Sequence, residues 1–242
     1  MRFVAMALLV VCITFTCVGA NELVFFDNFN DGNIDGWVTF GYEPGYQVWC
    51  QDSELWGKAS SGSDCCHCPG CGAIAVVDDL ICSDFTIEVK LTNHNSCGGF
   101  GLRLRLEEET WDSSDDMLHI DYWQVYFDPG YSQGYWEMGA RVDGVWMPPG
   151  SQEGIASYSW GGPNYFRVVL HGQTMELWHR TDSQPDYTLI NTMTASGGST
   201  EGYVALMALQ SAKQASFDDV FIYSHETPVE KPTWGRVKAL YR

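Results

Sequence analysis

The densest group of reactive side chains in the sequence is a cysteine cluster. Four cysteines surround His67, and thiolates with an imidazole at this spacing can complete a tetrahedral zinc shell. In an oxidising compartment the same thiols form disulfides. No second Cys-x-x-Cys pair completes a zinc pattern, so the sequence favours a loop held by disulfides. After residue 20 the chain has seven cysteines, an odd number that leaves one over: Cys50, Cys65, Cys66, Cys68, Cys71, Cys82 and Cys97.

Aromatic and polar side chains recur at every second position of several segments, which suits recognition of sugars. Sugars present apolar ring faces and a rim of hydroxyl groups, so aromatic platforms beside fixed polar groups make a suitable receptor. Along residues 118–123, Asp121 and Trp123 are expected on the ligand side and Tyr122 on the core side. The alternative is that most of the ten tryptophans belong to the core and that the arginines form only cross-strand pairs. The candidate ligand-binding residues are Arg103, Arg105, His119, Asp121, Trp123, Glu176 and Trp178.

Several other functions are excluded by missing patterns and by charge. No Gly-x-Ser-x-Gly elbow, phosphate loop or His-Glu-x-x-His pattern occurs. The acidic run 107–109, followed by Asp112, Asp115 and Asp116, is typical of a solvated loop. With 31 acidic and 13 basic side chains, a net charge of −18, the composition argues against nucleic-acid binding, which draws on clustered Lys and Arg.

Residues 1–20 have the features of a secretory signal peptide. Arg2 precedes an apolar stretch, and Val18-Gly19-Ala20 matches the small-residue pattern of a signal-peptidase site. The stretch is too short for a comfortable membrane span, and no later segment approaches ~20 apolar residues. We therefore expect a soluble protein without a transmembrane segment, secreted to the extracellular space or the cell surface.

The elements that must position these side chains are β-strands, because the dominant period from residue 23 to residue 223 is two. Leu102, Leu104 and Leu106, for example, alternate with two arginines. No stretch shows a convincing helical period, and turn signals separate more than ten candidate strands, so residues 21–224 are predicted to form one β-sandwich domain. The candidate strands are 23–27, 36–40, 73–77, 85–91, 102–106, 118–127, 135–142, 165–171, 174–180, 203–209 and 215–223.

The composition changes in the carboxyl-terminal segment, residues 225–242. A linker-like stretch is followed by a short segment whose apolar residues fall on one side of a helix, and four basic residues lie in the last twelve positions. Two interpretations stay open: a frayed end, or a tag that docks the protein to an acidic or membrane-associated partner at the cell surface.

The two ends of the domain carry a family resemblance. The segment 25–32 followed by Trp37, and the segment 202–204 leading to Phe217-Asp218-Asp219-Val220, resemble the first and last strands of concanavalin A-like (laminin G-like) jelly-roll domains. The resemblance implies a two-sheet antiparallel jelly-roll sandwich with its first and last strands paired near one edge, and a concave face that binds carbohydrate. It also implies one structural Ca²⁺ near those strands, with Asp27 and Asp219 as matching carboxylates and Asp218 in reserve. The alternative is that these acids only cap turns.

Two enzymatic templates with this fold match the sequence poorly. Retaining glycosidases of the fold carry Glu-x-Asp-x-x-Glu, which supplies a nucleophile and an acid. The nearest stretch here, 119–124, has His119 and Gln124 where the glutamates would stand. The alginate-lyase type needs a Gln-x-His strand, and the similar segment 124–126 lacks the histidine.

Three functional hypotheses follow. The first is a secreted, non-catalytic jelly roll that binds a polysaccharide or glycan through an aromatic-lined concave sheet. The second is a structural or adhesive cell-surface protein attached by its carboxyl-terminal tail. The third is an enzyme similar to a glycoside hydrolase or polysaccharide lyase.

Overall fold

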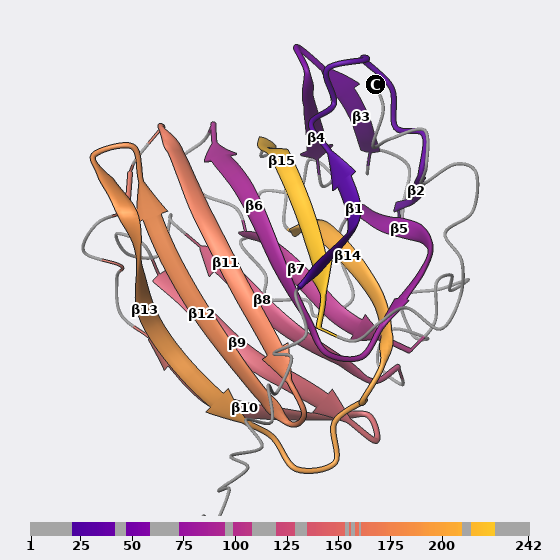
Figure 1. Cartoon of the computed structure of the whole chain (residues 1–242), viewed down its shortest axis with the longest axis vertical. Coiled ribbons are helices and arrows are strands. Elements are labelled where there is room, and N and C mark those ends of the chain that lie inside the picture. The colour runs from indigo at the N-terminus through magenta and orange to yellow at the C-terminus, as the bar shows by residue number, and fades with distance from the viewer. Residues whose placement is uncertain are drawn as a thin grey trace, which may run out of the picture.

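The computed structural model describes residues 21–41, 47–58, 73–94, 99–107, 120–128, 135–152, 155, 158–159, 161–209 and 214–225. These residues form a sandwich of two antiparallel sheets, and the two layers lie one in front of the other in Figure 1. The described part of the chain contains no α-helix. The predicted fold class, an all-β two-sheet antiparallel sandwich, is confirmed.

The order of strands in space differs from their order in the chain, as expected of a sandwich with long connections. The eight-stranded sheet runs through β13 (Gln184–Thr194), β12 (Thr174–Thr181), β11 (Pro163–His171), β6 (Phe85–Asn93), β15 (Gln214–Ser224), β4 (Glu54–Lys58) and β3 (Gln47–Gln51), and β1 (Glu22–Asp27) also pairs with β15. The seven-stranded sheet runs through β10 (Val145–Gln152), β9 (Tyr135–Val142), β8 (Tyr122–Asp128), β7 (Gly99–Leu106), β14 (Gly202–Leu209), β5 (Ala73–Cys82) and β2 (Trp37–Gly41).

The core lies between the two sheets and is built by the predicted alternation. Phe85, Ile87, Val89 and Leu91 of β6 are all buried in it, while the residues between them point outward. Strands β11 and β12 show the same strict alternation of buried and partly buried residues. Apolar side chains from both sheets thus leave water together, which is the main stabilising term of such a sandwich.

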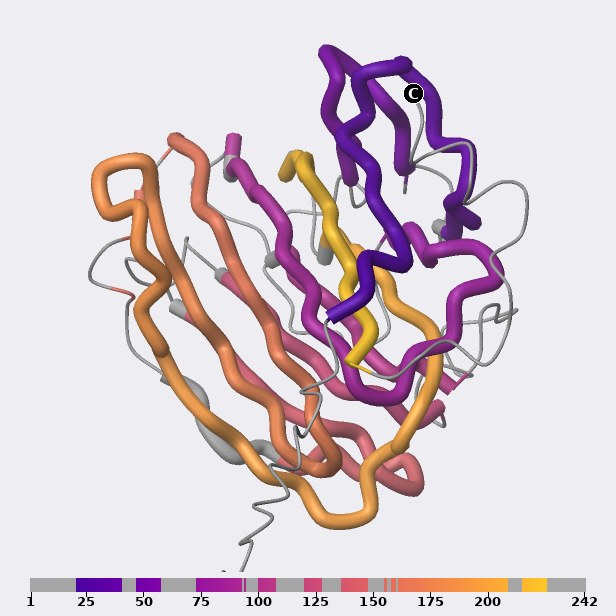
Figure 2. The backbone as a smooth tube through the Cα atoms, viewed as in Figure 1, coloured from indigo at the N-terminus to yellow at the C-terminus, as the bar shows by residue number. Residues whose placement is uncertain are grey.

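Strand β15 joins the two ends of the domain, as the family resemblance implied. Its first half pairs with β4 and its second half with β1, and β6 pairs along its other edge. The partner changes at a β-bulge around Asp218 and Asp219, where Asp219 has a φ of 48°. Figure 2 shows the resulting arrangement, with β1 to β4 in indigo and purple gathered at one end of the molecule beside the yellow β15.

A second bulge divides the arginines and leucines of β7. Arg105 has a φ of 50°, and the register with β14 shifts between Tyr203 and Ala205. Because a bulge inserts one extra residue, it reverses the side to which the following residues point. Leu104 therefore lies in the central core and Leu106 in a second cluster on the outer side, so the prediction of a common face for these leucines is wrong.

Four strands were missed by the period-two analysis: β3, β4, β10 and β13. Three of them, β3, β10 and β13, are edge strands. In β3 and β13 almost no side chain is buried, so neither face requires a regular alternation of apolar residues. Strand β10 even contains Pro148 and Pro149, which predicted a turn. Proline is tolerated there because the register is irregular between Met147 and Gly150 on a sheet edge.

Several predicted features lie outside the described residues. These are the signal peptide at 1–20, five of the cysteines (Cys65, Cys66, Cys68, Cys71 and Cys97), His119, and the tail from residue 226 onward. No described segment forms an apolar helix of membrane-spanning length.

Candidate functional site

The predicted ligand-binding residues lie on three different surfaces. Arg103 is on the outer side of the seven-stranded sheet, and Arg105 and Trp123 lie inside the sandwich. Glu176 and Trp178 are on the outer side of the eight-stranded sheet. The predicted convergence of these side chains in one groove is therefore wrong, because the segments that carry them belong to opposite layers.

Trp123 is fully buried in the central core, and its neighbour Tyr122 points outward. The indole Nε1 of Trp123 donates a hydrogen bond to the backbone oxygen of Ser199 at 3.1 Å. Gly198 lies against the same ring, and a Cβ there would be 3.0 Å from Nε1. The predicted orientation of this pair was reversed, because large aromatic residues on both faces of β8 make either assignment fit the pattern.

Arg105 is a structural clamp. Its guanidinium donates to the backbone oxygens of Ser83, Gly172 and Ser199 at 2.7, 2.6 and 3.2 Å, and it forms an ion pair with Asp84 at 2.9 Å. The side chain is fully buried. These partners come from three separate loops, so Arg105 ties one end of the sandwich together and is not placed to contact a ligand.

Asp121 is a turn-capping residue at the start of β8. Its carboxylate accepts hydrogen bonds from the backbone N–H groups of Asp143 and Gly144 in the β9–β10 turn. Partial burial raises the pKa of Asp121, the nearby charges of Glu107 and Asp143 raise it further, and the two hydrogen bonds oppose them. The Asp121 carboxylate is therefore occupied by the neighbouring β9–β10 turn.

The outer side of β7 to β10 forms what we call the closed face. At its centre the guanidinium of Arg103 lies 4.7 Å from the centre of the Tyr122 ring, and its Nε donates to Gln124 at 3.4 Å. Both Arg103 and Tyr122 are fully buried, and the Tyr122 hydroxyl has no hydrogen-bond partner among the described residues. The residues of the closed face are Arg103, Tyr122, Gln124, Tyr126, Glu137, Arg141 and Trp146.

The closed face does not carry a glycosidase pair in its described part. Of the outward side chains described on β7, β8 and β9, Glu137 is the one carboxylate. A retaining glycosidase needs two carboxylates about 5 Å apart, one as nucleophile and one as acid. The described strands therefore do not supply that chemistry.

The outer side of β6, β11, β12 and β13 forms a second surface, the open face. Trp178 lies at its centre, and its Nε1 donates to Glu176 at 3.0 Å. Its register partners are Arg167 on β11 and Leu189 on β13. Arg167 is paired with Glu88 of β6 at 2.7 Å and is 36% exposed. The residues of the open face are Glu88, Tyr165, Arg167, Glu176, Trp178, Arg180, Tyr187 and Leu189.

Two tyrosines organise the arginines of the open face. Tyr187 reaches from the edge strand β13 to Arg167, whose guanidinium lies 4.0 Å from the ring centre. Arg180 lies 3.8 Å from the ring centre of Tyr165 and 5.2 Å from that of Tyr187. Burial raises the pKa of Tyr187, with a further contribution from the charge of Glu88, so this phenol stays neutral and protonated.

The accessible tryptophans differ in what packs against their rings. Trp49 and Trp56 stack on each other at 6.1 Å, His94 stacks on Trp56 at 4.2 Å, and Trp146 packs against Tyr122. Trp178 has no other aromatic ring packed against it among the described residues. It is therefore the described, partly exposed tryptophan best placed to receive a ring from a ligand.

Among the described residues, the accessible basic side chains all belong to one sheet. Of the six lysine and arginine side chains that the structure describes, Lys90, Arg167 and Arg180 on the eight-stranded sheet are partly exposed. The other three, Arg103, Arg105 and Arg141, are buried. In a chain with a net charge of −18, this concentrates the described accessible positive charge on the side that holds Trp178.

Arg167, Arg180 and Tyr165 were not predicted as site residues, although the same alternation that indicated Glu176 and Trp178 also puts them on the outward side of predicted strands. Tyr187 could not have been found in this way, because β13 was not predicted.

Two of the three carboxylates proposed for calcium, Asp27 and Asp218, already accept hydrogen bonds from N–H donors. Asp27 accepts from the backbone of Phe29 at 2.8 Å and from the Trp37 indole at 2.7 Å. Asp218 accepts from the Lys90 ammonium at 2.8 Å. Burial raises the pKa of Asp27 and that of Asp219.

Lys90 supplies the positive charge at this junction. Burial opposes the charge of its ammonium, but the hydrogen bond and charge of Asp218, with Glu54 at 3.9 Å, raise the Lys90 pKa above its usual value. No group of three or more His, Cys, Asp or Glu side chains among the described residues is arranged to hold a metal. Calcium binding stays a prediction.

Two of the seven predicted framework cysteines are described. Cys50 is half-buried, with its thiol 3.7 Å from the backbone oxygen of Phe29, and Cys82 is buried. No disulfide joins Cys50 to Cys82. The disulfide framework and the alternative zinc site stay predictions.

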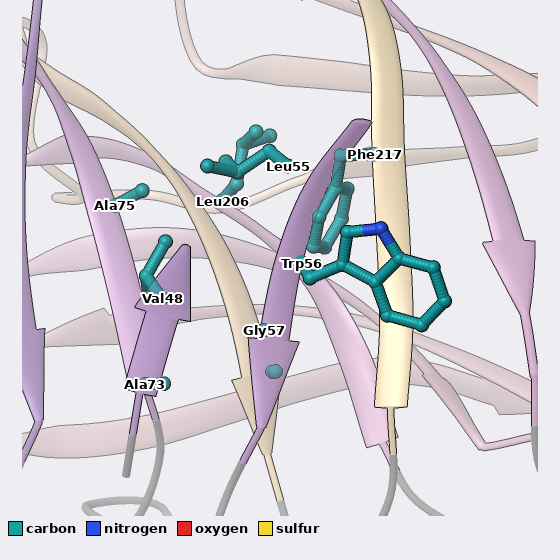
Figure 3. Close-up of a pocket in the computed structure, with 9 residues that line it drawn as sticks. Val48, Leu55, Trp56, Gly57, Ala73, Ala75, Leu206 and Phe217 are labelled. Carbon is teal, nitrogen blue, oxygen red and sulfur yellow. The ribbon is translucent and has the colours of Figure 1, made fainter. Parts of the chain in front are cut away.

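A narrow gap between the layers is a packing seam (Figure 3). It measures about 170 Å³ including its mouth and has essentially no room for a water-sized molecule. Gly57 of β4 approaches Ala208 of β14 so closely that an added Cβ would lie 2.7 Å from the alanine methyl group. The gap is lined by apolar residues: Val48, Leu55, Trp56, Gly57, Ala73, Ala75, Leu206, Ala208 and Phe217. Such a gap offers a ligand neither space nor polar contacts.

Solved structures with the same arrangement of strands establish the fold. A carbohydrate-binding module, CBM66 from Bacillus subtilis, superposes with a TM-score of 0.55 at 15% identity, covering 79% of this chain and 98% of that one. A prokaryotic β-1,3-1,4-glucanase (lichenase) from a mouse hindgut metagenome gives 0.59 at 9% identity, covering 84% and 99%. A protein of unknown function with a galectin-like fold from Bacillus subtilis gives 0.56 at 10% identity, covering 84% and 96%.

The protein therefore has the fold of a two-sheet jelly-roll sandwich. The expected family resemblance is thereby confirmed at the level of the fold. No protein-family model matches the sequence, and no curated protein matches it. Identities of 9 to 15% carry the fold and not the activity of these neighbours.

Proposed function

We propose that this jelly roll binds carbohydrate without cleaving it, and that the open face is the binding surface. The observation that carries the proposal is Trp178, which is partly exposed, has no aromatic ring packed against it in the described structure, and is held by its hydrogen bond to Glu176. A sugar ring stacks on such an indole through its axial C–H groups.

Polar groups lie around this platform at positions where sugar hydroxyls need them. Glu176 lies on one side of Trp178 along β12, and Arg167, paired with Glu88, lies on the adjacent strand. Carboxylates accept and guanidinium groups donate hydrogen bonds, so both sides of a hydroxyl can be satisfied. The strands are rigid and twist together, which fixes these groups before the ligand arrives and lowers the entropy cost of binding.

The absence of cleavage rests on the described carboxylates of both faces. The closed face offers Glu137 alone, and on the open face Glu88 is ion-paired while Glu176 accepts the indole N–H. Each of these two carboxylates is thus held by a partner on the same face, and neither is proposed as a nucleophile or an acid. The fold neighbours include both a carbohydrate-binding module and glucanases, so the likeness by itself supports either activity.

The place of action that fits this function is outside the cell. The signal-peptide pattern of residues 1–20 supports export, and polysaccharides are accessible to an exported protein. The partner would be a polysaccharide or glycan of the surroundings or of a cell surface.

The test is a glycan array followed by affinity electrophoresis of wild type, Trp178→Ala and Trp56→Ala. Trp56 is the matched control, because it is also a partly exposed tryptophan but has His94 stacked on it at 4.2 Å. We expect Trp178→Ala to lose about tenfold or more in affinity and Trp56→Ala to bind like wild type. No binding to any glycan, or equal effects of the two variants, would contradict the proposal. Release of reducing sugar from a bound polysaccharide would contradict its non-catalytic part.

A further inference from the structure

We infer that the glycan bound by the open face is acidic, and that Arg180 recognises its carboxylate or sulfate group. This inference rests on the proposed carbohydrate binding and adds the class of ligand. It starts from the contacts of Arg180, which differ from those of the other basic side chains on the same sheet.

Arg180 makes no ion pair with a described carboxylate. Arg167 is paired with Glu88 at 2.7 Å and Lys90 with Asp218 at 2.8 Å. Arg180 instead contacts the rings of Tyr165 and Tyr187 and hydrogen-bonds the side chain of Tyr187. The charge of Arg180 acts on Asp219, whose pKa it lowers, but no described carboxylate lies within ion-pair distance of the Arg180 guanidinium.

The two tyrosines hold Arg180 in a fixed orientation. Its guanidinium lies 3.8 Å from the ring centre of Tyr165 and 5.2 Å from that of Tyr187. A guanidinium that lies over a ring keeps its N–H donors at its edge. One of these donors is hydrogen-bonded to Tyr187, and those that remain can bind the oxygens of a carboxylate or sulfate. Little side-chain entropy is left to lose when an anion binds.

The distance from Arg180 to the platform suits a single saccharide chain. Arg180 and Trp178 are two residues apart on β12 and point to the same side, which separates their Cα atoms by about 6–7 Å. A glycan whose one ring stacks on Trp178 can therefore bring a charged substituent of that ring or the next to Arg180.

The overall charge of the chain does not favour this recognition. The net charge is −18, so the chain as a whole repels a polyanion at long range. A preference for an acidic glycan over its neutral form then points to a local contact, and the Arg180 variants test whether that contact is on the open face. Comparing the charged and uncharged forms of one glycan therefore measures the contribution of the charged substituent to binding.

The experiment compares each acidic glycan with its own neutral form. The carboxylate arm uses polygalacturonate, alginate and hyaluronan, each as the free acid and as the methyl ester, and the sulfate arm uses dextran sulfate against dextran. Wild type, Arg180→Gln and Arg180→Lys are measured by affinity electrophoresis. Circular dichroism checks that all three fold.

We expect wild type to bind at least one acidic glycan about tenfold or more tightly than its neutral form, because charge-assisted hydrogen bonds to a guanidinium are the strong ones. Arg180→Gln should bring this ratio near one, because it should weaken binding of the acidic form much more than binding of the neutral form. Arg180→Lys should restore part of it, since a lysine keeps the charge but lacks the planar fork. The arm in which the preference occurs distinguishes carboxylate from sulfate.

The outcomes separate this inference from the proposed function. Binding of glycans without a preference for the acidic forms, or a preference that Arg180→Gln leaves intact, overturns the inference and leaves carbohydrate binding standing. Binding to no glycan at all overturns both.

Discussion

The outer faces of the two sheets have a similar pattern of side chains, but one is buried and the other is partly exposed. Each has aromatic and basic side chains at alternate positions of neighbouring strands. On the closed face Arg103 is fully buried and Arg141 is 8% exposed. On the open face Arg167 is 36% exposed, and Arg180 and Trp178 are partly exposed. Residue type and spacing alone therefore do not tell a ligand surface from a second core.

The difference lies in the outward neighbours of the polar side chains. Strands β5 and β14 add Ile74, Val76 and Met207 to the outer side of the seven-stranded sheet, where they form an apolar cluster with Tyr122. The corresponding outward residues of β6 are Thr86, Glu88 and Lys90. Removing apolar side chains from water lowers the free energy of the folded protein, whereas removing charged side chains from water raises it unless they find partners.

Strand β12 shows the same contrast on its own two sides. His179 points inward, is 1% exposed, and shares a hydrogen bond of 3.1 Å with Asn164. Trp178 and Arg180, on either side of it in the chain, point outward. Substitutions on the inner and closed sides should therefore affect stability, and substitutions on the open side should affect binding.

The largest effect is expected from removing the buried arginine of the closed face. Arg103→Ala should lower the free energy of unfolding by about 3 kcal/mol, because it leaves a cavity beside Tyr122 and deprives Gln124 of a donor. Arg167→Ala on the open face should cost no more than about 1 kcal/mol, because exposed ion pairs contribute little. Urea denaturation of both variants measures the difference, and equal costs would remove the distinction between the faces.

Acid should destabilise the protein through the inner side of β12. Burial lowers the pKa of His179 from 6.5 to about 4. The unfolded state then binds a proton more readily than the folded state does. The free energy of unfolding therefore falls as the pH drops from 6.5 to about 4, by roughly 3 kcal/mol in total. Denaturation at a series of pH values tests this.

Two variants make the pH experiment specific. His179→Gln should flatten the pH dependence even if it lowers stability at neutral pH. His94→Gln, on the outer side of the same sheet, should leave most of the dependence in place, because His94 is much less buried. An unchanged pH profile in His179→Gln would assign the acid sensitivity to other groups.

A smaller loss is expected where the closed face packs against a glycine. A Cβ on Gly139 would overlap the ring of Trp146, and the ring must move. Gly139→Ala should cost about 2 kcal/mol and shift the tryptophan fluorescence. The matched control Thr192→Val, at an exposed position of β13 on the open side, should stay within about 0.5 kcal/mol of wild type. A Gly139→Ala variant with the stability of wild type would show that the Trp146 ring can move at no cost.

The smallest effect on stability is expected next to the platform. Leu189 is 42% exposed and is the register partner of Trp178. Leu189→Ser should change the free energy of unfolding by less than about 0.5 kcal/mol. The same variant should weaken glycan binding several-fold, because the apolar surface beside the indole is reduced. A loss of stability without a loss of binding would place Leu189 in the packing of the sheet.

The strands with a strict period of two were predictable from sequence, and with them part of the site. Strands β6, β11 and β12 follow the predicted alternation, so the outward positions of Glu176 and Trp178 agree with the expectation. The predicted orientation of Trp123 was wrong because both Trp123 and Tyr122 are large and aromatic, and the pattern of residue types alone does not tell which of them points inward. The prediction of Arg105 as a ligand-binding residue was wrong because a β-bulge turns its side chain inward.

The sequence by itself determined a sandwich of two antiparallel sheets, because side chains alternate across a strand and the apolar half must leave water. Only the tertiary structure decided which outer side is open, where the bulges fall, and that Trp178 and Arg103 belong to opposite layers. These properties depend on the pairing of segments far apart in the chain, and a one-residue shift in that pairing reverses every side chain beyond it.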